Sequence, residues 1–250
     1  MKRKILTVFS LTYTVGLFVI FISCNSGSKS KTDSSVSKEQ VTSDMIQGAF
    51  ELVSPNQGYV IYLDDYFLFI YGNSDNTMFS NGGKYEISGD TITDHFLFST
   101  NPNMVGSTKW IAERLKGDTI KGTMFNPDGS IQGVFRMSKK VEPTEETRSQ
   151  MKDIEGFYQY AAPNRGLSTM LGGYYIYLYG QPDGEMIAQA GKYKVDKDKT
   201  TCKNQFATNP QLIGVESDWI KKSVIGNTLT WVTIDDKGEI TSTGQSVRPD

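Results

Sequence analysis

The sequence contains very little histidine and cysteine. His95 is the only histidine in 250 residues, and Cys24 and Cys202 are the only cysteines. This supply is too small for a zinc cluster, which takes three or four His, Cys or acidic ligands. No Walker or Rossmann glycine pattern occurs either. His95 beside Asp94 is the one catalytic pair left to consider, so we expect no metal, no cofactor and no enzymatic activity.

An excess of positive charge is also absent. The chain has 26 Lys and Arg against 28 Asp and Glu. Removal of residues 1–23 would take away three basic residues and no acid, which leaves 23 against 28 and a net charge near −5. A surface of that sign does not attract a phosphate backbone, so nucleic acid is not an expected partner.

The first 24 residues have the pattern of an export signal. Lys2, Arg3 and Lys4 precede the largely apolar run ILTVFSLTYTVGLFVIFIS, and Cys24 follows it. The segment FISC, residues 21–24, resembles a lipobox, in which the cysteine is acylated and becomes the mature N-terminus. This resemblance implies attachment to membrane lipid through Cys24. The alternative is an uncleaved membrane anchor, because the run is almost long enough to cross a bilayer.

One phrase occurs twice in the chain. FSTNPNMVG at residues 98–106 returns as FATNPQLIG at residues 206–214. With a shift of 108, about a third of the positions between Gly48 and Gly106 are identical to their counterparts, and a shift of 109 then pairs Trp110 with Trp219. The period is far longer than the roughly 20 to 50 residues of a solenoid repeat. Each copy is therefore expected to be a domain.

The repeat and the composition together divide the chain into five segments. We expect a signal peptide, a lipidated Ser- and Lys-rich tether, a first domain, a charged linker and a second domain, at residues 1–23, 24–44, 45–140, 141–153 and 154–250. Cys202 has no disulfide partner if Cys24 carries lipid, so stability must come from burial. Domains of this length are large enough for that.

Both copies have the local pattern of strands. Short runs of aromatic and β-branched residues are interrupted by Gly, Asn, Asp or Pro every ten to twelve positions, and no segment keeps a helical period. Each copy contains eight such runs, the first from Ala49 and the second from Phe157. Eight antiparallel strands joined by short turns close into a barrel and leave no exposed edge. The sequence predicts an all-β protein of two tandem up-and-down barrels.

A family resemblance supports this prediction. GAF at Gly48 and GFY at Gly156 resemble the Gly-x-Trp that begins lipocalins, with Phe50 and Tyr158 in place of the tryptophan. GGKYEISGDTIT followed by STNPNMVG resembles the small lipocalin-like lipoprotein domains of Bacteroidota. The resemblance covers nearly all of both repeats. It implies barrels with a small internal cavity that binds an apolar or amphipathic molecule.

Aromatic alternation indicates where a ligand would lie. In YFLFIYG, residues 66–72, Phe67, Phe69 and Tyr71 share one face, while the other face is apolar too and is expected to meet the sister domain. The candidate ligand-binding residues are Phe69, Tyr85, Trp110, Tyr177, Tyr193 and Trp219. A core filled by these rings is the alternative, because an eight-stranded barrel is only just wide enough for its own side chains.

The repeated phrase itself allows two roles. Pro102 and Pro210 fix their own φ and end the preceding strand, so the segment can simply keep the shape of a turn. The same segment can also cover a barrel mouth as a lid. The candidate lid residues are Asn101, Pro102, Met104, Asn209, Pro210 and Leu212.

The function that these features favour is binding without catalysis. We expect a lipoprotein of the bacterial outer membrane, facing the periplasm rather than the cell surface, that binds a small hydrophobic or amphipathic molecule. The alternative is a structural adaptor with filled barrels that binds another envelope protein. A cavity above roughly 300 Å³ favours the first function.

Overall fold

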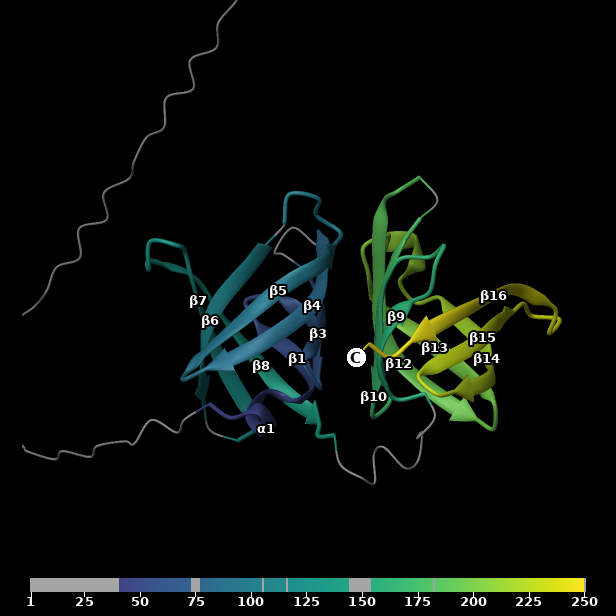
Figure 1. Ribbon diagram of the computed structural model, residues 1–250, viewed down its shortest axis with the longest axis horizontal. Helices are drawn as coiled ribbons and strands as arrows, with labels where there is room; N and C mark the ends of the chain where they lie inside the picture. Colours follow the sequence, from purple (N-terminus) through teal and green to yellow (C-terminus); the bar gives the residue numbers. More distant parts are fainter. Residues whose placement is uncertain are drawn as a thin grey trace, which may run out of the picture. The chain divides into compact units, whose positions relative to one another are not determined.

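The computed structural model describes residues 41–72, 77–104, 106–115, 117–143, 154–181 and 183–249. The first barrel is closed by eight antiparallel strands, with β1 paired to both β2 and β8 (Figure 1). Its strands are β1 (Gly48–Ser54), β2 (Gln57–Leu63), β3 (Tyr66–Gly72), β4 (Met78–Ser88), β5 (Thr91–Ser99), β6 (Gly106–Arg114), β7 (Thr119–Phe125) and β8 (Ile131–Val141).

The second barrel repeats this plan. Its strands are β9 (Gly156–Tyr160), β10 (Gly166–Leu171), β11 (Tyr174–Gly180), β12 (Met186–Asp196), β13 (Lys199–Ala207), β14 (Glu216–Ile225), β15 (Thr228–Ile234) and β16 (Ile240–Val247). β9 closes the barrel by pairing with both β10 and β16. The prediction of two tandem, antiparallel, eight-stranded barrels is confirmed.

The main difference from the expected strands is where β4 and β12 begin. One of the eight expected runs in each copy, GGKYEIS at residues 82–88 and AGKYKVD at residues 190–196, is only part of a longer strand, because β4 begins at Met78 and β12 at Met186. The pairing register shifts next to Gly83 and Gly191, which marks a bulge inside each strand. A Cβ on Gly83 would lie 1.8 Å from the His95 carbonyl oxygen, so only glycine fits this approach.

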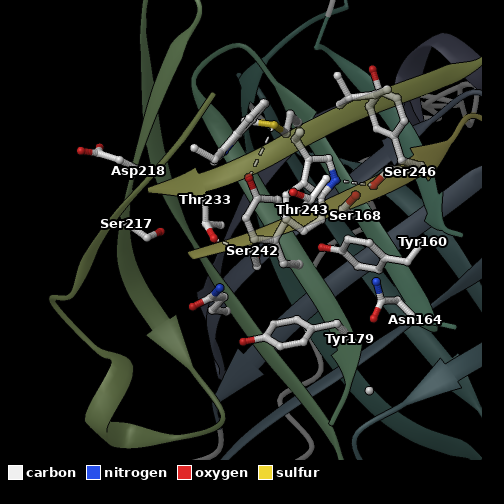
Figure 2. Close-up of a pocket in the computed structure, with 18 residues that line it drawn as sticks. Tyr160, Asn164, Ser168, Tyr179, Ser217, Asp218, Thr233, Ser242, Thr243 and Ser246 are labelled. Atoms are coloured by element: carbon white, nitrogen blue, oxygen red, sulfur yellow. Dashed lines mark hydrogen bonds between the residues drawn. The ribbon is translucent and has the colours of Figure 1, made fainter. Parts of the chain in front are cut away.

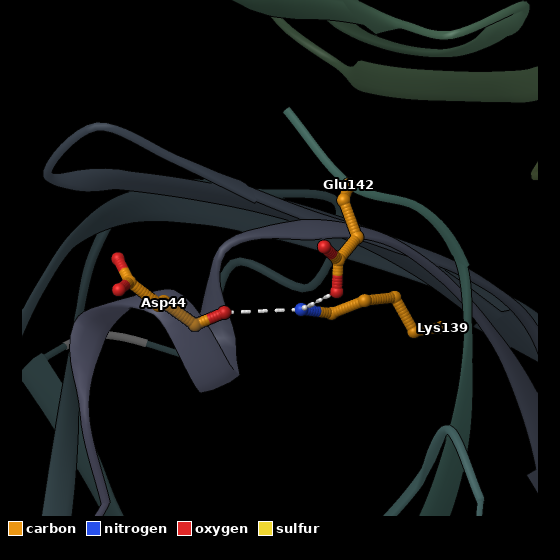
Figure 3. A network of polar contacts seen from close by, with 3 residues as sticks. All are labelled: Asp44, Lys139 and Glu142. Carbon is orange, nitrogen blue, oxygen red and sulfur yellow. Dashed lines mark hydrogen bonds and ion pairs between the residues drawn. The ribbon is translucent and has the colours of Figure 1, made fainter. Parts of the chain in front are cut away.

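A short helix covers one end of the first barrel. α1 (Ser43–Ile46) places Met45 and Ile46 in the core, and Val41 before it is also buried, although residues up to 44 were expected to belong to a tether. Lys139 of β8 holds α1 in place (Figure 3). Its Nζ donates to the Asp44 carbonyl at 3.0 Å and lies 3.4 Å from Glu142 Oε1.

The second barrel has a matching cation at the same place. Arg248, just after β16, donates to the Glu155 carbonyl at 2.8 Å and to the Tyr158 hydroxyl at 3.1 Å. Its guanidinium lies 5.4 Å from the Tyr158 ring centre, just as Lys139 Nζ lies 5.4 Å from that of Phe50. In each barrel, a basic residue in or just after the last strand therefore binds the segment that precedes the first strand.

The two apolar faces of β3 separate two cores. Phe67 and Phe69 point into the first barrel, whereas Leu68 and Ile70 join one hydrophobic cluster with residues of β9 to β12. Tyr59 reinforces this cluster, since its hydroxyl donates to Gln205 Oε1 at 2.7 Å. The expectation that the second apolar face meets the sister domain is confirmed. No helix among the described residues is long and apolar enough to cross a membrane.

Candidate ligand-binding cavities

The second barrel encloses a cavity of about 470 Å³ (Figure 2). Its rings are Tyr158, Tyr160, Tyr177, Tyr179, Trp219 and Trp231, and its polar groups include Asn164, Ser168, Gln189, Thr233, Ser242 and Ser246. Strand alternation explains the lining, because every second residue of β11 points inward. The cavity therefore combines aromatic walls with hydroxyl and amide groups.

Tyr177 shows how the buried hydroxyls behave. Its hydroxyl lies 3.4 Å from Cys202 Sγ and 3.7 Å from Met170 Sδ, which are weak partners. Burial raises its pKa well above the usual tyrosine value. Tyr177 is therefore a neutral phenol that keeps hydrogen-bonding capacity for a guest.

Trp231 forms part of the opposite wall. Its indole Nε1 donates to Ser246 Oγ at 3.1 Å, and its ring lies over Gly244, where a Cβ would come within 2.3 Å of Cζ2. This contact fixes the orientation of the indole. A rigid ring of this kind is suited to stacking against a ligand.

The charge in this lining belongs to Asp218, at the margin. In Figure 2, Ser217 and Asp218 lie apart from the other labelled residues. Lys199 Nζ lies 2.6 Å from Asp218 Oδ2, and Thr201 donates to Oδ1 at 2.6 Å. Burial alone would raise the Asp218 pKa, but these two partners lower it. The Asp218 carboxylate is therefore ionised and already paired with a cation.

The first barrel has a smaller cavity of about 200 Å³. Rings and thioethers form most of its wall, among them Phe69, Phe96, Trp110, Phe135, Met104 and Met124. Asp94 of β5 also lines it and is only 3% exposed. Burial raises the Asp94 pKa to about 7, against hydrogen bonds from Trp110 and Tyr62 that lower it.

The candidate ring residues fall into two groups. Phe69 and Trp110 line the smaller cavity, and Tyr177 and Trp219 line the larger one. Tyr85 and Tyr193 lie deeper, at the covered ends of the barrels. Tyr85 packs edge-on against Tyr62 at 5.0 Å between ring centres, and the Tyr193 hydroxyl donates to Glu155 Oε1 at 3.1 Å. These two tyrosines are placed as core residues.

In the first copy of the repeated phrase, Met104 lines the cavity of the first barrel. Its Sδ accepts from Asn81 Nδ2 at 3.2 Å. Asn101 accepts from the Asn103 amide at 3.1 Å, so Asn101 and Pro102 form a local turn.

In the second copy the phrase forms the helical turn η1 (Pro210–Leu212). Asn209 caps it by accepting from the Gln211 amide at 3.1 Å, and Asn204 Nδ2 binds the Leu212 carbonyl at 3.0 Å. These bonds favour the shape-keeping role of the segment over a moving lid.

His95 and Asp94 do not meet. Asp94 points inward, whereas His95 is exposed and its Nε2 lies 3.4 Å from Glu86 Oε1. Throughout the described ranges, no three His, Cys, Asp or Glu side chains gather where they would hold a metal ion.

Sequence reasoning missed Asp94 as a cavity residue, although the signal was present. Ile92, Asp94 and Phe96 alternate along one face of TITDHFLFS, so a carboxylate stands between two inward apolar residues. Such a position places an acid inside the barrel.

The fold and the cavities define a class: antiparallel β-barrel proteins with an internal cavity, here in two tandem copies. This fits the lipocalin-like architecture that the sequence resembles. The sequence matches no family model and no curated protein.

Proposed function

We propose that this protein is a non-enzymatic binding protein of the bacterial cell envelope and that its second barrel holds a small apolar or amphipathic molecule. The observation that carries this proposal is the cavity of about 470 Å³ lined by tyrosine and tryptophan. Ligand sites typically measure about 300 to 1,000 Å³ and combine apolar walls with a few polar groups.

The lining also limits the chemistry of the guest. Tyr160, Tyr177 and Tyr179 all have a pKa raised by burial, so they offer neutral hydroxyls. Asp218 is paired with Lys199. A neutral molecule with at least one flat ring and one or two polar atoms suits these walls, because the rings stack while the hydroxyls bond its polar atoms.

Membrane attachment is part of the same proposal. Acylated Cys24 would hold the barrels at the outer membrane, on the periplasmic side, but Cys24 lies outside the described residues. An adaptor that binds another envelope protein requires filled barrels. The open second barrel supports ligand binding instead.

Fluorescence titration of the full chain tests this function. N-phenyl-1-naphthylamine is a neutral, ring-bearing dye that brightens when it leaves water. We expect wild type to bind it, and Ser168→Phe, which fills the cavity from β10, to bind it at least roughly tenfold more weakly. Ser107→Phe, the same change on an exposed residue of β6, is the matched control. No binding by wild type, or equal binding by all three proteins, would favour the adaptor.

A further inference from the structure

Asp94 lines the cavity of the first barrel, and the protein satisfies only one of its two carboxylate oxygens. Oδ2 accepts from Trp110 Nε1 at 2.9 Å and from the Tyr62 hydroxyl at 3.1 Å. No group among the described residues donates to Oδ1, which is also buried. One half of the carboxylate is satisfied by the protein, and the other half is buried without a donor.

A compensating cation is also missing from this cavity. The described residues that line it include no lysine, arginine or histidine, and the neighbouring His95 points outward toward Glu86. Burying an unpaired carboxylate costs free energy, which is why burial raises the Asp94 pKa to about 7. A cationic guest would offset part of this cost by pairing with the carboxylate.

The rest of the wall suits an organic cation. Phe69, Phe96, Trp110 and Phe135 line the same cavity as Asp94 with aromatic rings. Ring faces attract ammonium groups, most strongly where water is excluded. Thioethers such as Met104 and Met124 add a polarisable, adaptable surface.

The volume sets the size of the guest. A dry apolar cavity of about 150 Å³ holds a benzene molecule. The first barrel offers about 200 Å³, which leaves room for one ring and a short arm.

We propose that the first barrel is a binding site for a small arylalkylamine, whose ammonium pairs with Asp94 while its ring packs among Phe69, Phe96 and Trp110. This site is separate from the cavity of the second barrel, so it goes beyond the function proposed above.

The second barrel shows why the site belongs to the first barrel alone. The position equivalent to Asp94 is Cys202, which is fully buried and lies 3.4 Å from the Tyr177 hydroxyl. Burial raises the Cys202 pKa to about 11, so this thiol is neutral. At this position the first barrel has a carboxyl group without a cation beside it, whereas the second has a neutral thiol, and the Asp218 carboxylate of the second cavity is already paired with Lys199.

Calorimetric titration of the full chain compares two probes of nearly equal shape, 2-phenylethylammonium and the neutral 2-phenylethanol. Wild type should bind the ammonium more tightly. Asp94→Asn should weaken ammonium binding at least roughly tenfold and leave the alcohol within about twofold. Asp218→Asn removes a carboxylate at the other cavity and should leave ammonium binding unchanged.

A pH series on wild type gives a second test that needs no variant. Besides Asp94 itself, the titratable groups that line this site are Tyr62 and Tyr71, with Tyr85 packed behind Tyr62, and burial raises the pKa of all three above the ordinary tyrosine value. Ammonium affinity should therefore follow Asp94 ionisation, rising between about pH 5.5 and 8 while alcohol affinity stays flat.

Three results would overturn the amine site: equal affinity of wild type for the two probes, unchanged ammonium binding by Asp94→Asn, or an ammonium affinity independent of pH. If Asp94→Asn does not fold, the wild-type comparisons still decide. Binding of N-phenyl-1-naphthylamine by the second barrel should persist in Asp94→Asn, so failure of the amine site is distinguishable from failure of the proposed function.

Discussion

Asp94 and Cys202 occupy the same position in the two barrels, each opposite the tyrosine of a GKY segment. Asp94 pairs with Tyr85 across β4 and β5, and Cys202 pairs with Tyr193 across β12 and β13. The backbone is the same at both places, but one interior gains an acid and the other a thiol. The two barrels have the same strand arrangement but different chemical groups in their interiors.

The first prediction concerns stability and pH. The Asp94 pKa is about 7 in the folded protein against 3.8 for an unperturbed aspartate. Between these values the folded state binds more protons than the unfolded state, so the free energy of unfolding falls as pH rises through this window. The shift of about three units corresponds to a loss of up to about 4 kcal/mol by pH 8.

Asp94→Asn should remove this loss. Urea unfolding at about pH 5 and pH 8 measures it, and the difference between the two pH values should be smaller in the variant than in wild type. An equal pH dependence in both proteins would show that Asp94 does not titrate in this range.

The second prediction separates a core tyrosine from a cavity tyrosine. Tyr193→Ala should destabilise the protein by about 3 to 5 kcal/mol and leave dye binding in the folded fraction unchanged, because Tyr193 is buried against Glu155. Tyr177→Ala should cost less, since Tyr177 already borders open space, and should weaken dye binding. Chemical unfolding and dye titration of both variants test the contrast, and the reverse pattern would exchange the two roles.

The third prediction tests the cation that holds α1. Lys139→Ala should destabilise the protein by about 1 to 3 kcal/mol, because it removes the donor to the Asp44 carbonyl from a nearly buried site. Lys140→Ala is the matched control, since its ion pair with Glu51 is part-exposed and contributes at most about 1 kcal/mol. Hydrogen exchange at Met45 and Ile46 should accelerate in the first variant alone. Equal effects of the two substitutions would remove the special role of Lys139.

The fourth prediction concerns the bulge in β4. Gly83→Ala would bring a Cβ within 1.8 Å of the His95 carbonyl, so we expect a large loss of stability or a failure to fold. Gly89→Ala lies in a turn with positive φ but with nothing within 4 Å, and it should cost about 1 kcal/mol. Thermal unfolding ranks the two variants. A folded Gly83→Ala protein as stable as Gly89→Ala would contradict the close approach.

The fifth prediction concerns the anchor. Cys24→Ser should abolish incorporation of a fatty-acid analogue during growth, because it removes the cysteine to which the lipid would be attached. A labelled variant would show that the lipid is attached elsewhere.

The sequence predicted the barrels well because period-two patterning specifies both a strand and its two faces. YFLFIYG was sufficient to separate the interior of the first barrel from its outer apolar face. The sequence did not predict that β4 and β12 continue on both sides of their glycines. A glycine that ends a strand and a glycine at a bulge look alike until the partner strand is known. α1 was missed because four residues carry no helical period.

The depth of a side chain inside the barrel was also beyond the sequence. Alternation directs Tyr85 and Phe69 alike to the interior. Whether such a ring fills the core or borders a cavity depends on what covers the barrel end, and in the first barrel that cover is α1. For Asp94, the alternation of the strand was enough to predict that the side chain points inward. The sequence could not show that one of its carboxylate oxygens would have no hydrogen-bond donor.

The contact between the barrels is close to reciprocal. β2 lies against β11 as β10 lies against β3, and β3 lies against β12 as β11 lies against β4, although the contact of β3 with β13 has no match of equal extent between β11 and β5. Reciprocal contacts of this kind are what a two-fold axis produces between identical subunits. Equivalent strands therefore use the same apolar face as their contact surface, while the interiors behind that face differ, with Asp94 in one barrel and Cys202 in the other.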